Sequence, residues 1–189
     1  MGPIIVIAAS AGGLDPLRQI VSAFSAPCLA SVFIVSQVGP HPSILPELLG
    51  MRARLPVSHG EDGEPFEASH IYVAPPDAHM YLDRGLIRMD HGAKIHHTRP
   101  AADPLFMSAA ENYGARVIGI VLSGYDSDGA EGLRIIKECG GITLIQEPVE
   151  AEQSSMPCAA ILADHPNGIL PANEIAERMA ALCSRSAEG

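Results

Sequence analysis

The chain has 189 residues, 47% of them hydrophobic, so it is long enough to close one sizeable core, and we expect a single domain over residues 1–189. It carries 12 lysine and arginine residues against 22 aspartate and glutamate residues, a formal net charge of −10, and no tryptophan. This composition argues against a surface that tracks phosphates and stacks bases, so nucleic acid is not an expected partner.

The first ten residues, MGPIIVIAAS, carry no targeting or membrane signal. They lack a basic n-region, and their apolar run is too short to cross a bilayer, so we predict a buried strand and no membrane insertion. The cysteines lie far apart, form no C-x-x-C pair and belong to a chain too large to need covalent staples. We therefore expect reduced thiols, no disulfide and a cytoplasmic location for a chain with Cys28, Cys139, Cys158 and Cys183.

Hydrophobic periodicity along the chain predicts an α/β fold. Continuous apolar runs, typical of strands buried on both faces, occupy residues 3–10, 30–38, 116–124 and 140–147. Segments with a helical period lie between them, at residues 14–24, 42–53 and 128–140. This alternation predicts a doubly wound, mostly parallel sheet with helices on both faces.

The middle of the chain, residues 56–100, interrupts this alternation. Short strand-like pieces are separated there by glycine, proline and aspartate turns, which predicts a small β-rich insertion near the sheet edge. A helix over residues 103–113 then returns the chain to the core, and residues 173–185 predict a last helix with Asn173 as its cap.

The turn after the first predicted strand places Ser10 in the sequence AASAGG, directly before a helix. Ligands of doubly wound sheets collect beyond the carboxyl ends of the strands, and glycines there let the backbone approach a reacting group. Ser10 is therefore either a nucleophile or a polar residue that shapes the loop and caps the helix. A dinucleotide loop or a P-loop is disfavoured, because Gly-x-Gly-x-x-Gly is not present and no lysine follows Gly13.

The turn after the third apolar run, SGYDSDG at residues 123–129, carries several hydrogen-bond acceptors. Asp128 could orient a histidine, or it could cap the helix that begins near Gly129. A calcium loop is disfavoured, because this turn has neither the earlier aspartate nor the downstream bidentate glutamate of such loops.

Several stretches, taken in order, resemble the catalytic domain of the chemotaxis protein-glutamate methylesterases, the CheB-type family. The resemblance runs over most of the chain, and its stretches are IAASAGG at 7–13, HGEDGE at 59–64, IYVAPPDAHM at 71–80, TRPAADPLF at 98–106, VLSGYDSDGAEGL at 121–133 and SSMPCAAI at 154–161. The resemblance implies a Ser-His-Asp hydrolase on a doubly wound parallel sheet. Its reaction is hydrolysis of glutamate γ-methyl esters on chemoreceptors, with release of methanol and without a cofactor.

Carried over by motif, the resemblance assigns Ser10 as the nucleophile and Asp128 as the acid that orients the base. The backbone N–H groups of Ala11 and Tyr125 are the implied oxyanion donors. The implied partner is the methylated cytoplasmic segment of a chemoreceptor, and a separate response regulator is a second candidate partner. Many family members carry an N-terminal receiver domain, whereas this chain begins at the first strand of the catalytic domain, so control by a receiver within it is not expected.

The sequence departs from the family pattern after the second strand. The family has its catalytic histidine directly after a glutamine, and here Val38 follows Gln37. A serine without a neighbouring base is a poor nucleophile, so two interpretations stay open: a methylesterase that uses a substitute base, with His41 as first candidate, and a catalytically silent homologue that binds a receptor or signalling partner. Val38→His is expected to raise hydrolysis if the pocket is otherwise intact.

Two further groups of polar residues are singled out by the sequence. Arg99 and Asp103 lie in the family stretch near the mouth of the site, where they either bind substrate carboxylates or hold their own loop through an ion pair. The histidine cluster of residues 91, 96 and 97 lacks regular ligand spacing and a neighbouring cysteine, so we expect no metal.

Overall fold

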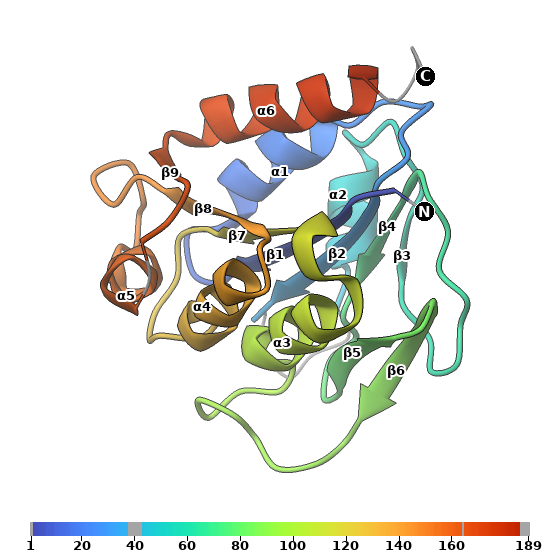
Figure 1. Ribbon diagram of the computed structural model, residues 1–189, viewed down its shortest axis with the longest axis horizontal. Helices are drawn as coiled ribbons and strands as arrows, with labels where there is room; N and C mark the ends of the chain where they lie inside the picture. Colours follow the sequence, from blue (N-terminus) through green and yellow to red (C-terminus); the bar gives the residue numbers. More distant parts are fainter. Residues whose placement is uncertain (1, 38–42, 164, 186–189) are drawn as a thin grey trace.

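A seven-stranded parallel sheet forms the centre of the computed structural model, which describes residues 2–37, 43–163 and 165–185 (Figure 1). The strand order is β3-β4-β2-β1-β7-β8-β9, and every neighbouring pair is parallel. The strands are β1 (Ile4–Ala9), β2 (Ser31–Ser36), β3 (Val57–His59), β4 (His70–Val73), β7 (Val117–Val121), β8 (Ile142–Gln146) and β9 (Gly168–Leu170). The order reverses at β1, so the predicted doubly wound sheet is confirmed.

Helices cover both faces of this sheet (Figure 1). One face holds α1 (Leu14–Ala23), α2 (Leu45–Gly50) and α6 (Ala172–Arg185), and the other holds α3 (Ala102–Tyr113), α4 (Ala130–Glu138) and α5 (Ser155–Ala163). Alternate residues of β1 separate the two cores, since Ile5 and Ile7 pack with α1 and α6 whereas Val6 and Ala8 pack with α3 and α4. Within the described residues, none of the helices combines the length and hydrophobicity that crossing a bilayer requires.

The predicted β-rich insertion divides into two parts. Its first strands, β3 and β4, extend the parallel sheet at one edge, whereas β5 (His79–Asp83) and β6 (Leu86–Asp90) form a small antiparallel hairpin that packs on α3. Two elements, α5 and β9, were not predicted from the sequence. The apolar residues of α5 show almost no helical period, and β9 has three residues, so neither gives a periodic signal. Asn173 lies inside α6, which begins at Ala172, so its prediction as the cap was wrong.

The expectation of reduced cysteines is corrected by a disulfide between Cys28 and Cys183. Cys28 lies in the loop before β2 and Cys183 near the end of α6, and the two residues are 155 positions apart in sequence. They meet because α6 packs along α1 on the face where this loop enters the sheet. Cys139 and Cys158 are free and exposed.

Cys183→Ser is expected to lower the free energy of unfolding by about 2–4 kcal/mol, because the disulfide closes a long loop and restricts the unfolded chain. Denaturant unfolding of the oxidised protein measures the effect. Cys158→Ser is the matched control, since this cysteine is exposed and unbonded. Equal stabilities of the two variants would contradict the prediction.

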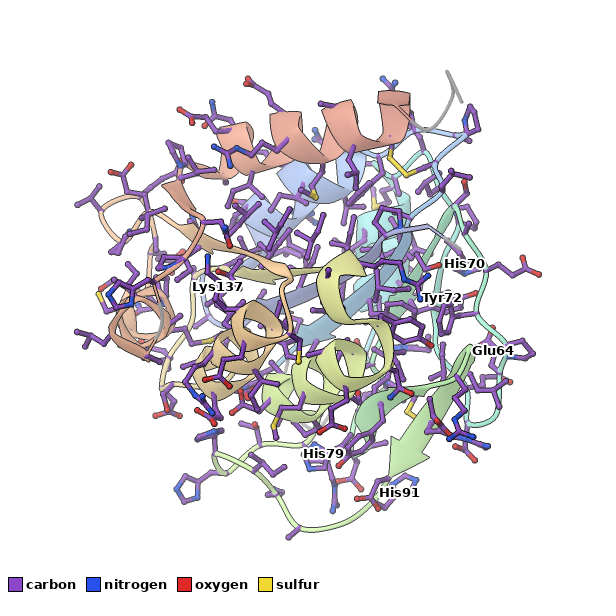
Figure 2. The ribbon with its side chains drawn as sticks, in the orientation of Figure 1. Glu64, His70, Tyr72, His79, His91 and Lys137 are labelled. Carbon is purple, nitrogen blue, oxygen red and sulfur yellow. A yellow bond between two sulfur atoms is a disulfide. The ribbon has the colours of Figure 1, made fainter. Side chains whose placement is uncertain are left out.

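His70, at the start of β4, gives the fold a dependence on pH (Figure 2). Its ring stacks on Tyr72 with 4.2 Å between centroids, and its Nε2 lies 2.8 Å from the Ser58 hydroxyl. Burial lowers the pKa of His70 below its ordinary value of 6.5, although the charges of Glu64 and Glu67 oppose the shift. The unfolded chain therefore binds this proton more tightly than the folded chain does.

The contribution of His70 to stability is complete above pH 6.5 and is lost as the pH falls from there toward the lowered folded pKa. We expect His70→Gln, which keeps a donor near Ser58, to lose less stability than the wild type between about pH 7.5 and about pH 5.5. Urea unfolding at both pH values measures this difference. His91→Gln serves as the control, and an unchanged pH dependence in His70→Gln would exclude the effect.

Candidate active site

The predicted site residues meet where the strand order reverses. Ser10 follows the carboxyl end of β1, Gln37 that of β2, and Asp128 lies in the turn that follows β7. The three strands are neighbours in the sheet, so their following residues share one crevice. The backbone fixes this arrangement, because Ser10 N–H donates to Ser123 O at 2.9 Å and Gln37 N–H donates to Ala9 O at 3.2 Å.

The turn that carries Ser10 depends on glycine. Gly12 has φ +71°, and a Cβ there would lie 2.5 Å from Glu152 Cβ and 2.8 Å from Ser123 Oγ. Ser123, which is fully buried, donates its hydroxyl to Ala11 O at 2.8 Å and accepts from Gln153 N–H at 2.9 Å. The loop is therefore held from β1, β7 and the segment before α5, and this places Ser10 at a fixed position above the sheet.

Gln37 bridges Ser10 and Asp128. The Ser10 hydroxyl donates to Gln37 Oε1 at 3.4 Å, and Gln37 Nε2 donates to Asp128 Oδ2 at 2.8 Å and to Thr98 Oγ1 at 3.0 Å. Neither Gln37 nor Thr98 was predicted to belong to the site. The position of Gln37 directly after a strand, like that of Ser10, was the signal that could have identified it.

Asp128 is 1% exposed and accepts three hydrogen bonds. Besides the Gln37 amide, the N–H groups of Ala102 and Asp103, at the start of α3, donate to its carboxylate at 2.7 and 3.1 Å. Burial is the main reason that the pKa of Asp128 is raised. The Ala102 N–H opposes the shift, the charge of Asp103 adds to it, and the Asp103 N–H and His96 oppose it.

The alternative that Asp128 caps the helix beginning near Gly129 is corrected by these contacts. The N-cap of α4 is Gly129, in the left-handed region, and it carries no side-chain capping bond. Asp128 instead binds the first N–H groups of α3, a helix that lies before it in the sequence. It is therefore a capping residue, although of the other helix.

Asp103 completes a reciprocal arrangement between α3 and α4. Its Oδ1 accepts from Gly132 N–H in the first turn of α4 at 2.8 Å, and its Oδ2 accepts from His96 Nε2 at 3.0 Å. Ligand atoms of His96, Asp103 and Asp128 lie within 4.8 Å of one another, which is a spacing that a metal ion could use. Both carboxylates are already committed to the N–H groups named above, so the cluster is accounted for as the joint between the two helices.

Arg99 is engaged within its own loop. It donates to Asp77 Oδ1 through Nε at 3.0 Å and Nη2 at 2.5 Å, and to the carbonyl oxygens of His91 and Gly92 through Nη1. His79, 1% exposed, supports the same loop, since its Nδ1 accepts from Ala101 N–H and its Nε2 donates to Ala93 O (Figure 2). These contacts favour the loop-holding role of Arg99 over substrate binding.

The implied oxyanion donors, Ala11 and Tyr125, lie in the turns that follow β1 and β7. Among the described residues, no acceptor pairs with the backbone N–H of Ala11 or of Tyr125, and the Tyr125 side chain is 53% exposed. Val38 and His41, the predicted histidine position and the predicted substitute base, lie outside the described residues. The described side chain that stands between the serine and the carboxylate is that of Gln37.

The fold and site define a doubly wound α/β domain with a serine, an amide and a carboxylate in line at the carboxyl edge of the sheet. Residues 5–179 match the family described as CheB methylesterase. The crystal structure of the Thermotoga maritima CheB methylesterase catalytic domain superposes with a TM-score of 0.91 at 29% identity, covering 96% of this chain and 99% of that one. The chain belongs to the CheB methylesterase family.

Similar proteins are named protein-glutamate methylesterase/protein-glutamine glutaminase. A Leptospira interrogans protein with both activities in its name is 33% identical over 179 residues, covering 92% of this chain and 91% of its own length. The protein of Pyrococcus horikoshii is 34% identical over 178 residues, or 92% of this chain and 48% of its own. The Anaeromyxobacter dehalogenans protein is 34% identical over 173 residues, or 91% and 51%. The chain thus spans about half the length of the last two relatives.

Proposed function

We propose that this chain is a binding member of its family, which receives methyl-esterified glutamate side chains of a chemoreceptor segment at the Ser10 site with little or no hydrolysis. The observation that carries the proposal is the Gln37 amide between Ser10 and Asp128. A neutral amide accepts a hydrogen bond but takes no proton at neutral pH, so Ser10 stays a weak nucleophile. Because triad members act as a unit, loss of the base lowers turnover by up to about a millionfold.

The proposed ligand follows from the family and from the charge of the chain. The relatives carry protein-glutamate and protein-glutamine activities in their names, which supports a glutamyl ester or glutamine side chain as ligand. The net charge of −10 favours these neutral groups over a free carboxylate. A cytoplasmic location, a single domain over residues 1–189 and a response regulator as second partner belong to the same proposal.

Methanol release and binding test the proposal together. With a methylated chemoreceptor fragment, we expect no methanol above that from protein-free buffer, while fluorescence anisotropy detects binding that weakens when the fragment carries free glutamate instead of its methyl ester. Release that disappears in Ser10→Ala would contradict the proposal. Absence of binding to either form of the fragment would also contradict it.

A second candidate function is an active methylesterase that uses His41 as its base. It is favoured by the sequence, since His41 follows closely after Gln37, whose side chain touches Ser10. In that case methanol release is Ser10-dependent and falls in His41→Ala. His165→Ala is the control, because this histidine is exposed and lies between α5 and β9.

A further inference from the structure

We propose that Gln37 determines whether this chain hydrolyses esters. The family motif puts the histidine one residue later, at Val38, but the side chain that bridges Ser10 and Asp128 is that of Gln37, and the single substitution Gln37→His therefore gives a working Ser10–histidine–Asp128 relay. The inference deepens the proposed function, because it uses the same serine and carboxylate. It does not depend on a chemoreceptor ligand, since it concerns the chemistry of the serine alone.

The orientation of the Gln37 amide is determined by its neighbours. The Thr98 hydroxyl donates to Ile95 O at 3.0 Å, so its oxygen is free to accept, and the Asp128 carboxylate is an acceptor in any case. Both groups therefore require the NH₂ end of the amide, which reaches them at 3.0 and 2.8 Å. The remaining atom, Oε1, then faces Ser10.

This orientation keeps the Ser10 hydroxyl protonated. Its hydrogen can point to Gln37 Oε1, 3.4 Å away, but an amide oxygen is too weak a base to remove it. The Asp128 carboxylate meanwhile accepts hydrogen bonds from the N–H groups of Gln37, Ala102 and Asp103. The site is therefore arranged like a relay. Among the described side chains that contact Ser10, however, none has an atom that can accept its proton.

An imidazole in place of the Gln37 amide would supply a nitrogen that can take the Ser10 proton. Like the amide, it is a planar group with two polar atoms, so one ring nitrogen can donate to Asp128 while the other faces Ser10. That nitrogen takes the Ser10 proton as Oγ bonds to the ester carbonyl carbon, and returns it to the leaving alkoxide as the carbon–oxygen bond breaks. Water then attacks the acyl carbon and loses a proton to the same nitrogen. The bond between this carbon and Oγ breaks, the nitrogen returns the proton to Oγ, and the acid leaves with the Ser10 hydroxyl restored.

The test uses para-nitrophenyl acetate, a small ester that requires no receptor recognition. We expect Gln37→His to release nitrophenol at least about a hundredfold faster than the wild type, a gain typical of a positioned general base, and to lose the gain in Gln37→His with Ser10→Ala. The dependence on pH should follow the titration of one histidine. Val38→His tests the competing expectation from the family motif, which predicts the gain at the adjacent residue instead.

A second variant keeps the inference testable if an imidazole disturbs the loop. Gln37→Gly removes the amide, and added free imidazole is expected to restore Ser10-dependent hydrolysis with saturation. Folded Gln37→His and Gln37→Gly proteins without any gain would overturn the inference, as would a gain in Val38→His alone. Binding of the methylated fragment is measured separately, so its failure contradicts the proposed function and leaves the assignment of Gln37 intact.

Discussion

Asp128→Asn is expected to lower the free energy of unfolding by about 2–3 kcal/mol. The carboxylate accepts from Ala102 N–H and the Gln37 amide through Oδ2 and from Asp103 N–H through Oδ1. An asparagine has one acceptor oxygen, so its NH₂ would face a buried N–H donor that is left without a partner. Of the described residues, no buried side-chain polar atom lacks a hydrogen bond, so this would be a new defect.

Asp126→Asn provides the matched control for this substitution. Asp126 lies in the same turn and loses the same charge, but it is exposed, and its positive φ of 64° is one that asparagine tolerates. Urea unfolding of both variants at neutral pH separates the role of the buried carboxylate from the general effect of charge. Equal losses would show that Asp128 does not stabilise the start of α3.

Gly12→Ala is expected to lower the free energy of unfolding by about 2–4 kcal/mol, because two penalties add at this turn. The residue has φ +71°, where a Cβ is strained, and the added carbon would lie 2.5 Å from Glu152 Cβ and 2.8 Å from Ser123 Oγ. Relief requires the loop of Ser10 to move away from its hydrogen bonds with Ser123. The substitution should therefore also displace Ser10 from Gln37.

The control for Gly12 is Gly50→Ala at the end of α2. No atom lies within 4 Å of an added Cβ there, so stability is expected to rise by up to about 1 kcal/mol, through the better helical propensity of alanine. Thermal unfolding of both variants measures the expected loss of stability in Gly12→Ala and the expected gain in Gly50→Ala. A neutral Gly12→Ala would mean that the turn has room and freedom that the structure does not show.

The two buried carboxylates near the site stabilise helix starts, so a member of the family can lose its hydrolytic activity and still keep them. Asp128 and Asp103 join the starts of α3 and α4 through buried N–H groups, whatever happens at Ser10. Their removal would harm the fold, whereas a change at Gln37 alters a side chain that only bridges. A domain that stops hydrolysing can therefore keep its carboxylates for stability and lose its base, which is the pattern proposed for this chain.

The sequence by itself determined the alternation of strands and helices and placed Ser10 and Asp128 at strand ends, because burial on both faces and helical period are local patterns. Tertiary structure alone decided which helix Asp128 caps, that Cys28 meets Cys183 and that β3 and β4 extend the main sheet. It also decided that Gln37, 91 residues from Asp128, stands between serine and carboxylate. These contacts depend on strand order and side-chain direction, which no local pattern encodes.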